Sequence, residues 1–376
     1  MNFSFWEHDT WIRDIDIAII GSGIVGLSCA LSLRDRFPHK KIVVFEKGML
    51  PSGASTKNAG FACFGSISEI MDDLKSHSEE EVITLVKERL NGLSLLRQQL
   101  GDEAIDLQYH GGYELFTQED AALYEHCMDN VTYVNDLLSE AFSDENEVFS
   151  IKSDPFSFKN VQKKLIFNRF EGQLDTGKMM LSLIKKCAAQ GIFILNNAEI
   201  TSFSVKNDQI SLVLNEKQEI SVAKLGIATN GFAQKLLSES VQPARAQVVV
   251  TQPIPNLAIK GTFHLDKGYY YFRNIHNRIL FGGGRNLDFD AEETTAFGLT
   301  SRVQDQLEYL LRTTILPETP FEIDTRWSGI MGVGNQKKPI VKKVQPHVYC
   351  GVRLGGMGVA IGSSIGQQLA ALIESE

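Results

Sequence analysis

Cysteine is scarce in this sequence, and its arrangement excludes the frameworks that cysteine usually builds. Only five cysteines occur among 376 residues, and no two stand in CxxC spacing. This pattern predicts neither a disulfide framework nor a metal site, and a reducing cytoplasm is the expected location. Long apolar runs are missing as well, and "MNFSFWEHDTWIRDID" has neither the basic nor the apolar region of a signal peptide. We therefore expect no transmembrane segment and no secretion signal.

Positive charge is also limited. The sequence has 37 lysine and arginine residues against 46 aspartate and glutamate residues, a formal net charge of −9 at pH 7. The densest basic run, "QKKPIVKK" at 336–343, is typical of a solvated loop and strand edge. Nucleic-acid binding is therefore not expected. The hydrophobic content of 43% is enough for the core of one large domain or of two interlocked domains.

The start of the sequence predicts a strand, a helix and a second strand. "DIDIAII" at 14–20 is a short apolar run rich in β-branched residues, which indicates a buried strand. "GIVGLSCALSLRDRF" at 23–37 has the apolar spacing of a helix, and "KKIVVFEKG" at 40–48 is a second buried strand. Such a βαβ unit implies a parallel sheet and an α/β fold class.

The rest of the sequence mixes helices with antiparallel strands. Helices are predicted at 77–100, at about 119–141, at 177–190 and at about 298–313, and two strands are predicted within 105–118. Runs with antiparallel turn spacing follow at 247–254, 269–274 and 278–285, and the tail at 346–376 reads as a strand, a glycine turn and a helix. A domain that is discontinuous in sequence and carries an insertion explains this order better than two domains in series.

A glycine fingerprint connects the first strand to the first helix. Gly21, Gly23 and Gly26 stand in GxGxxG spacing, which permits a tight turn, the close approach of a pyrophosphate and close helix packing. The amides at the start of the helix then face the diphosphate. Glu46 follows about 20 residues further on, at the end of the next strand, where an acid binds ribose hydroxyls. These features predict a dinucleotide site but leave FAD and NAD open.

The loop "PSGASTKNAGFACFGS" at 51–66 favours FAD. NAD-binding units usually continue directly into their second helix, whereas this loop offers short polar side chains and bare backbone. The polar residues are Ser52, Ser55, Thr56 and Asn58, and the bare backbone lies at Gly53, Ala59 and Gly60. This chemistry fits a second wrap around a ribityl-diphosphate chain and the edge of a flavin, although an ordinary flexible loop has a similar composition.

The C-terminal segment is consistent with the same cofactor. "GVRLGGMGVAIGSSIGQQLAALI" places Gly355, Gly356 and Gly358 directly before a helix. The start of that helix can face the pyrimidine end of a flavin, which carries negative charge when reduced. Glycines that serve helix packing alone are the alternative.

The order of these segments resembles the D-amino-acid-oxidase-like FAD-dependent oxidoreductases, a family that includes glycine oxidase, sarcosine oxidase and γ-glutamylputrescine oxidase. The resemblance covers nearly the whole chain, through "DIAIIGSGIVGLSCALSL", "VVFEKG", "GASTKNAG", "HGGYELF", "LGIATNGFAQKLL", "VQPARAQVVVTQPI", "RILFGGGR", "RWSGIMG" and "GGMGVAIGSSIGQQLAALI". It implies a Rossmann-type FAD-binding domain interleaved with an antiparallel-sheet substrate domain. The FAD-binding domain would comprise 14–92, 158–237 and 325–376, and the substrate domain 93–157 and 238–324.

The resemblance also implies which residues bind FAD. They are Gly21, Gly23, Ile24, Val25, Gly26, Glu46, Lys47, Ser55, Thr56, Asn58, Ala59, Gly60, Ile200, Thr229, Gly231, Gly356, Met357, Gly358 and Val359. Non-covalent FAD is implied, because Lys57 and Asn58 stand where some relatives have a tethering histidine, and no cysteine aligns with the tethering cysteine of sarcosine oxidase. Leu280 stands near the position of an oxygen-activating lysine in sarcosine oxidase. Oxygen and another electron acceptor therefore both remain possible partners.

The expected reaction is hydride transfer from a carbon that bears an amine to flavin N5, on a small-molecule amine or amino acid. Candidate substrate residues are Tyr269, Tyr271 and Arg273 on one face of a strand, together with Arg353, Arg326 and His110. Sheet packing for the tyrosines and a structural role for the histidine are the alternatives. Two rival functions are also open, namely a dehydrogenase of a hydroxy acid or polyol phosphate and a non-catalytic flavoprotein.

Overall fold

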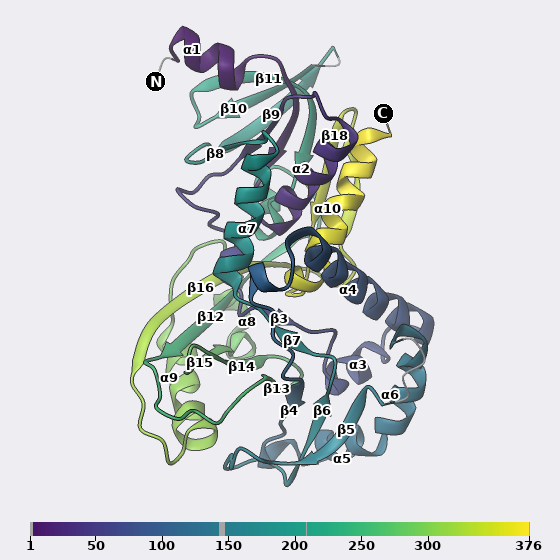
Figure 1. Ribbon diagram of the computed structural model, residues 1–376, viewed down its shortest axis with the longest axis vertical. Coiled ribbons are helices and arrows are strands. Elements are labelled where there is room, and N and C mark those ends of the chain that lie inside the picture. Colours follow the sequence, from purple (N-terminus) through teal and green to yellow (C-terminus); the bar gives the residue numbers. More distant parts are fainter. Residues whose placement is uncertain (1–2, 143–146, 208, 376) are drawn as a thin grey trace.

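The computed structural model describes residues 3–142, 147–207 and 209–375 and contains two large sheets (Figure 1). The first sheet, in the upper part of Figure 1, follows the order β17-β18-β11-β1-β2-β8, and β10 and β9 extend from β11. Its pairs β1–β2, β1–β11, β2–β8 and β11–β18 are parallel. Its strands are β1 (Ile15–Ile20), β2 (Ile42–Phe45), β8 (Phe193–Leu195), β9 (Ile200–Lys206), β10 (Gln209–Leu214), β11 (Gln218–Ile227), β17 (Ile340–Gln345) and β18 (Val348–Val352). The predicted βαβ unit and α/β class are confirmed.

The second sheet lies in the lower part of Figure 1 and follows the order β16-β12-β15-β14-β13-β4-β6-β5. All of its pairs are antiparallel except β13–β4. Its strands are β4 (Gly112–Glu114), β5 (Phe149–Ser153), β6 (Lys164–Asn168), β12 (Gln242–Thr251), β13 (Thr262–Leu265), β14 (Tyr270–Ile275), β15 (Arg278–Gly283) and β16 (Ile323–Val333). A two-stranded ribbon of β3 (Phe61–Ala62) and β7 (Gly172–Gln173) is separate from both sheets.

Ten α-helices accompany the sheets within the described residues. They are α1 (Phe5–Glu7), α2 (Ile24–Arg36), α3 (Ile67–Asp73), α4 (Glu79–Leu100), α5 (Ala121–Asp129), α6 (Val131–Leu138), α7 (Thr176–Ala189), α8 (Phe289–Glu292), α9 (Ser301–Leu310) and α10 (Gly358–Glu374). Short 3-10 turns lie at Ala54–Thr56, Glu103–Ile105, Gln118–Asp120, Ser139–Phe142, Asn230–Lys235 and Arg285–Leu287, and π-helical turns extend α1 at His8–Ile12 and α9 at Leu311–Ile315. Across the part of the chain that is described, no helix has both the length and the apolarity needed to cross a membrane.

The first sheet is buried on both faces, as its apolar strands predict. Ile17 and Ile19 of β1 join the hydrophobic core that contains the apolar residues of α2, α7 and α10. Ala18 and Ile20 join a second core on the opposite face, together with apolar residues of β9, β10 and β11. This double burial fixes the carboxyl ends of β1 and β2, where the first turn and Glu46 lie.

Two predictions about the middle of the chain are wrong, and one helix was missed. The helix expected at 119–141 is two helices, α5 and α6, because Asn130 has ψ near 7° and its side chain donates to the carbonyl of His126. Within 105–118 there is one strand, β4, preceded by an isolated bridge between Gln108 and Gln173. Helix α3 was not predicted, although Ser66 and Glu69 form a capping box at its start.

Close to the predicted domain boundaries, some strands belong to the other sheet than the one their predicted domain implies. β6 and most of β16 lie within ranges predicted for the FAD-binding domain, yet both strands pair in the second sheet. Helix α4 runs without a break through the predicted boundary at 92–93. The interleaved architecture is therefore seen in the sheets themselves, whereas the residue limits of the two domains stay a prediction.

Candidate functional site

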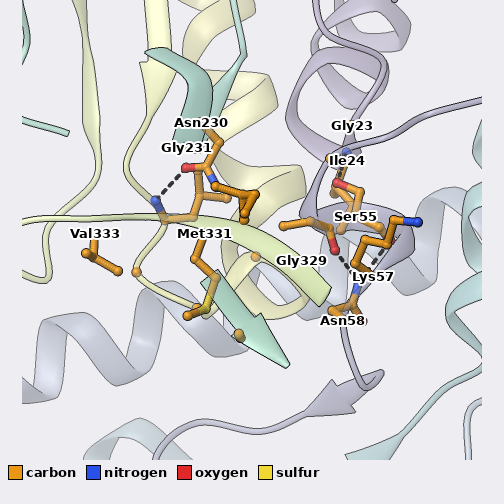
Figure 2. Close-up of a pocket in the computed structure, with 18 of the residues that line it drawn as sticks. Gly23, Ile24, Ser55, Lys57, Asn58, Asn230, Gly231, Gly329, Met331 and Val333 are labelled. Carbon is orange, nitrogen blue, oxygen red and sulfur yellow. Dashed lines mark hydrogen bonds between the residues drawn. The ribbon is translucent and has the colours of Figure 1, made fainter. Parts of the chain in front are cut away.

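A large cavity, of about 840 Å³, is lined by residues from both sheets. The first sheet contributes the ends of β1, β2 and β11, and the second sheet contributes parts of β12–β16. The loop at 52–61 and the turn before α10 complete the wall (Figure 2). The cavity therefore lies where the carboxyl ends of parallel strands predict a nucleotide site.

The first turn of the cavity wall is held by glycines. Gly21 has φ of +104°, and a Cβ there would lie 2.8 Å from the carbonyl oxygen of Ala228. A Cβ on Gly26 would lie 1.9 Å from the carbonyl oxygen of Gly21, so this residue permits α2 to pack against the end of β1. Gly23 supplies no capping side chain to α2, and Ser55 Oγ accepts a hydrogen bond from the Ile24 amide at 3.0 Å. The positive end of the α2 dipole thus faces the cavity.

Glu46 lies at the end of β2 and is only 5% exposed. One carboxylate oxygen accepts hydrogen bonds from the amide and hydroxyl of Ser22 at 3.2 and 2.8 Å. The other accepts from the Gly48 amide at 2.9 Å and from Ser52 Oγ at 3.0 Å. These donors fix the carboxylate at the cavity wall and engage both of its oxygens, so a ribose hydroxyl bound there would replace one of the two serine hydroxyls.

The polar side chains of the loop mostly hold the loop itself together. Thr56 Oγ1 donates to the carbonyl of Pro51 at 2.6 Å and does not line the cavity. Asn58 donates to the carbonyls of Ala54 and Ser55, and its own Oδ1 accepts from the Gly60 amide at 2.8 Å. The loop backbone is thereby fixed against the cavity, as the composition of the loop predicts.

The turn before α10 forms the opposite part of the wall. Gly355 and Gly356 have φ of +59° and +86°, and no protein atom lies within 4 Å of a Cβ built on Gly355. Asn230 ties this turn to the end of β11, because its Oδ1 accepts from the amides of Arg353 and Leu354 at 3.1 and 3.2 Å. Neither the N-cap of α10 nor that of α2 carries a side chain that caps its own helix. Two helix starts therefore present amides to one cavity.

The structure brings nearly all of the predicted FAD residues to this cavity. Those that line it are Gly21, Gly23, Ile24, Val25, Glu46, Lys47, Ser55, Asn58, Ala59, Gly60, Ile200, Thr229, Gly231, Gly356, Met357, Gly358 and Val359. Gly26 and Thr56 do not line the cavity. Gly26 permits the close packing of α2 against the end of β1, and Thr56 stabilises the loop at 52–61. Thr229 Oγ1 is buried and has no hydrogen-bond partner among the described residues, so the cavity wall carries an unsatisfied polar atom.

Lys47 occupies the end of the cavity near Ile200. Its ammonium lies 3.2 Å from the centre of the Phe232 ring. Burial, partly opposed by the charges of Glu199 and Glu46, lowers the pKa of Lys47. An aromatic ring and a held cation therefore stand where the resemblance implies the adenine end.

Two of the predicted substrate residues, Tyr269 and Tyr271, line the cavity. The ring of Tyr271 lies across Gly282, where a Cβ would be 2.7 Å from the ring. Tyr271 also faces His264 in the register of β13 and β14, and the ring of Phe61 packs edge-on against both. These three rings form one wall of the cavity.

Arg273 does not reach the main cavity, which corrects the prediction. It lines a separate cavity of about 30 Å³ with Asp106 and Asp175, and burial lowers its pKa to about 10. The strand alternation is right, but Gln173 of the β3–β7 ribbon covers this part of the face and donates to the Asn274 carbonyl. Asp106, Asp175 and His276 bring possible metal ligands within 4.8 Å of one another, beside the charge of Arg273.

The other predicted substrate residues are also engaged elsewhere. Arg353 donates to the carbonyls of Lys338 and Ser240, and Arg326 pairs with Glu308. His110 bonds Gln108 at 3.1 Å outside the cavity wall, and burial lowers the pKa of His110. None of these three side chains lines the cavity, so the structure does not bring them to the candidate site.

Arg285 is the cavity arginine that sequence reasoning missed. It is half-buried, its guanidinium lies 4.9 Å from the ring centre of Phe289, and the described residues give it no hydrogen bond or ion pair. Gly283 and Gly284, with φ of +127° and +77°, turn the chain back after β15 and bring Arg285 to the wall. The segment "RILFGGGR" could have predicted this position of Arg285, because three consecutive glycines directly before an arginine indicate a sharp turn.

A buried group of acids lies behind the wall. Glu114 accepts from the amide and hydroxyl of Ser68, and burial raises its pKa to about 7. Glu171 accepts from His264 Nε2 at 2.9 Å and from Thr262 Oγ1 at 2.9 Å. Sequence reasoning missed all three titratable groups, because strand pairing between distant segments brings them together.

Glu114→Gln should flatten the dependence of stability on pH. The folded pKa of Glu114 lies above its unfolded value, so unfolding releases a proton between about pH 4.5 and 7. Stability then falls as pH rises through this window, by roughly 3 kcal/mol at most, and the glutamine variant lacks this fall. Urea midpoints at about pH 5 and about pH 8 measure the effect. Glu119→Gln, an exposed carboxylate nearby, serves as the control, and equal slopes in both variants would contradict the prediction.

The comparisons with known proteins agree with this geometry. The model of the DAO family, described as FAD dependent oxidoreductase, matches residues 16–372. The probable oxidoreductase OrdL of Haemophilus influenzae is 22% identical over 97% of this chain and 84% of its own length. The γ-glutamylputrescine oxidoreductase of Escherichia coli is 22% identical over 96% of this chain and 84% of its own length.

Solved structures show the same fold. The L-proline dehydrogenase of P. horikoshii superposes with a TM-score of 0.74 at 17% identity, over 97% of this chain and 94% of its own. The glycine oxidase of Geobacillus kaustophilus gives a TM-score of 0.73 at 18% identity, over 96% and 95% of the two chains.

Proposed function

Because the chain belongs to the DAO family of FAD-dependent oxidoreductases, we propose that it oxidises the C–N bond of an amino acid or a related amine. The unpaired guanidinium of Arg285 in the cavity is the observation that carries this proposal. Its planar fork matches a carboxylate with two parallel hydrogen bonds. The names of the similar proteins support the same class, since they refer to glycine, L-proline and γ-glutamylputrescine.

The residues of the cavity fit FAD. Two helix starts whose own N-cap residues supply no capping side chain would face the diphosphate and the flavin ring, Glu46 would face a ribose, and Thr229 Oγ1 lacks a partner among the described residues. We propose that FAD is bound without a covalent link. Cys63 lines the cavity, but burial and the charges of Glu171 and Glu69 raise the pKa of its thiol and suppress the thiolate needed for attachment.

When bound, FAD supplies a hydride acceptor for the carbon that bears the amine. The protein has to hold that carbon about 3–3.5 Å from the acceptor atom and to keep water out. Arg285 would hold the carboxylate, and the rings of Phe61 and Tyr271 would form an aromatic wall of the substrate cavity. The imine product is then hydrolysed by water after hydride transfer.

The free and buried state of all five cysteines supports a reducing compartment. We therefore propose that the protein acts in the cytoplasm. The electron acceptor is oxygen or another molecule, and the experiment below separates these two alternatives.

Anaerobic absorption spectra of the purified protein test the proposed function. We expect flavin bands that bleach after pooled amino acids or amines are added, and division of the pool then identifies the substrate. Admission of air should restore the bands quickly for an oxidase and slowly for a dehydrogenase. Bands that bleach only with hydroxy acids or polyol phosphates would favour the rival enzyme. Bands that persist with every pool would favour a non-catalytic flavoprotein.

A further inference from the structure

His264 lies in the cavity wall and is fixed from behind by a buried carboxylate. Its Nε2 donates to Glu171 Oε2 at 2.9 Å, and Thr262 Oγ1 donates to the same oxygen. The side chains of His264 and Glu171 are only 6% and 1% exposed. Glu171 Oε1 is buried and has no partner among the described residues, so the neighbouring ring is what compensates the carboxylate charge.

These surroundings keep the ring protonated. Burial, the largest single influence, favours the neutral ring, but the charge and hydrogen bond of Glu171 and the charges of Glu69 and Glu114 outweigh it. The net result is a pKa of His264 raised to about 9. An imidazolium has two N–H donors, and only Nε2–H has an acceptor among the described residues.

The free donor of His264 has a polar neighbour. Tyr271 stands opposite His264 on β14, and its hydroxyl also has no hydrogen-bond partner among the described residues. A donor in the cavity wall that has no protein acceptor is available to a ligand oxygen. The ring and hydroxyl of Tyr271 lean across Gly282 on β15, away from β13, so His264 alone supplies an acceptor-binding point, separate from Arg285.

The charges around this point select a neutral acceptor. Glu69 on α3 lines the same cavity, Glu114 on β4 lies behind the wall, and Glu171 precedes β7. Glu69 and Glu171 place more negative charge around the ring than the one imidazolium compensates, and Glu114 adds to it as pH rises through about 7, so a second carboxylate would be repelled. A carbonyl oxygen of an amide or acyl group takes the hydrogen bond without that repulsion.

We propose that His264, held by Glu171, determines substrate specificity by binding a neutral carbonyl oxygen of the substrate. The substrate would then carry an amide or acyl group in addition to the carboxylate at Arg285. This inference rests on the proposed function, because it takes Arg285 as the carboxylate anchor. His264 is in this view a specificity-determining residue whose ring is positioned by Glu171.

Three small non-reacting ligands test the inference on the FAD-loaded protein. Butyrate, succinate and succinamate share one carboxylate and differ in the second group, which is a methyl, a carboxylate or an amide. Their dissociation constants can be measured from perturbation of the flavin spectrum, without turnover. We expect succinamate to bind at least about tenfold more tightly than butyrate and than succinate. This preference should fall as pH rises through about 9, while butyrate affinity changes little.

Two variants separate this role from a structural one. His264→Leu should abolish the preference for succinamate, and His276→Leu, at an exposed histidine outside the main cavity, should keep it. Glu171→Gln preserves the size of the side chain that holds the ring but removes the charge that keeps it protonated. In that variant the preference should be lost at a lower pH than in the parent. This second variant decides the question even if His264→Leu fails to fold.

Several results would overturn the inference. Equal affinities for succinamate and butyrate would show that no acceptor-binding point exists, and tighter binding of succinate would show that the point is anion-selective. Arg285→Met should weaken all three ligands by the same factor. If it weakens none of them, the carboxylate anchor of the proposed function is wrong, and the ratio of succinamate to butyrate still decides the role of His264. Failure of all three ligands to bind would overturn both.

Discussion

Gly26→Ala is expected to lower FAD retention by about tenfold or more, although Gly26 does not touch the cavity. The added Cβ would lie 1.9 Å from the carbonyl oxygen of Gly21. Relief of this contact requires α2 to move away from the end of β1, at a cost of roughly 1–3 kcal/mol. The amides at the start of α2 then move away from the diphosphate. The ratio of flavin to protein after purification, and the dissociation constant for added FAD, measure the loss.

Gly177→Ala provides the matched control for this prediction. Gly177 lies in the first turn of α7, outside the cavity wall, and its Cβ would meet only Asp175 Oδ1 at 3.2 Å. The same chemical change should therefore leave FAD retention unchanged. Equal retention in Gly26→Ala and Gly177→Ala would show that the close packing of α2 on its turn is not needed for the cofactor.

Arg285→Met should weaken the binding of a carboxylate substrate or inhibitor by roughly 10- to 100-fold. The variant keeps an unbranched side chain over the Phe289 ring but removes the charged donors, which are worth about 1.5–3 kcal/mol in such a bond. FAD content should not change, because the guanidinium binds substrate and not cofactor in this proposal. The Michaelis constant, or the inhibitor dissociation constant from flavin spectra, measures the effect.

Arg312→Met tests whether loss of an arginine over a phenylalanine is enough to cause this effect. The guanidinium of Arg312 lies 4.8 Å from the ring centre of Phe321, much like Arg285 over Phe289, but Arg312 is absent from the cavity wall. This variant should bind carboxylates as the parent does. If both variants weaken carboxylate binding equally, Arg285 does not act as the anchor.

The cofactor site could be predicted from sequence because its parts are local. Gly21, Gly23 and Glu46 belong to one βαβ unit, and Gly355 and Gly356 directly precede the helix that they serve. The residues of such local units have a fixed spacing along the chain, so they can be recognised from the sequence alone. The lack of covalent attachment and the individual cofactor contacts remain predictions.

The substrate wall could not be predicted to the same degree. Arg273 lies on the face that strand alternation predicts, but Gln173 from a distant ribbon covers it. His264 is positioned by its hydrogen bond to Glu171, which is far away in sequence. No sequence pattern around His264 predicts this hydrogen bond. Pairing between distant strands decides which residues of a face stay open to a cavity, and periodicity within one strand does not contain that information.

The pairing of the first sheet sets the order in which this protein can be completed during synthesis. Ile17 of β1 lies beside Lys224 of β11, and Leu225 of β11 lies beside Val348 of β18. The opening βαβ unit therefore emerges from the ribosome long before its neighbouring strands exist. High contact order of this kind slows folding and leaves strand edges exposed to chaperones or to aggregation. FAD can be enclosed only after α10, which lines the cavity and lies far from β1 in sequence, has been synthesised, so cofactor supply bears on yield late in folding.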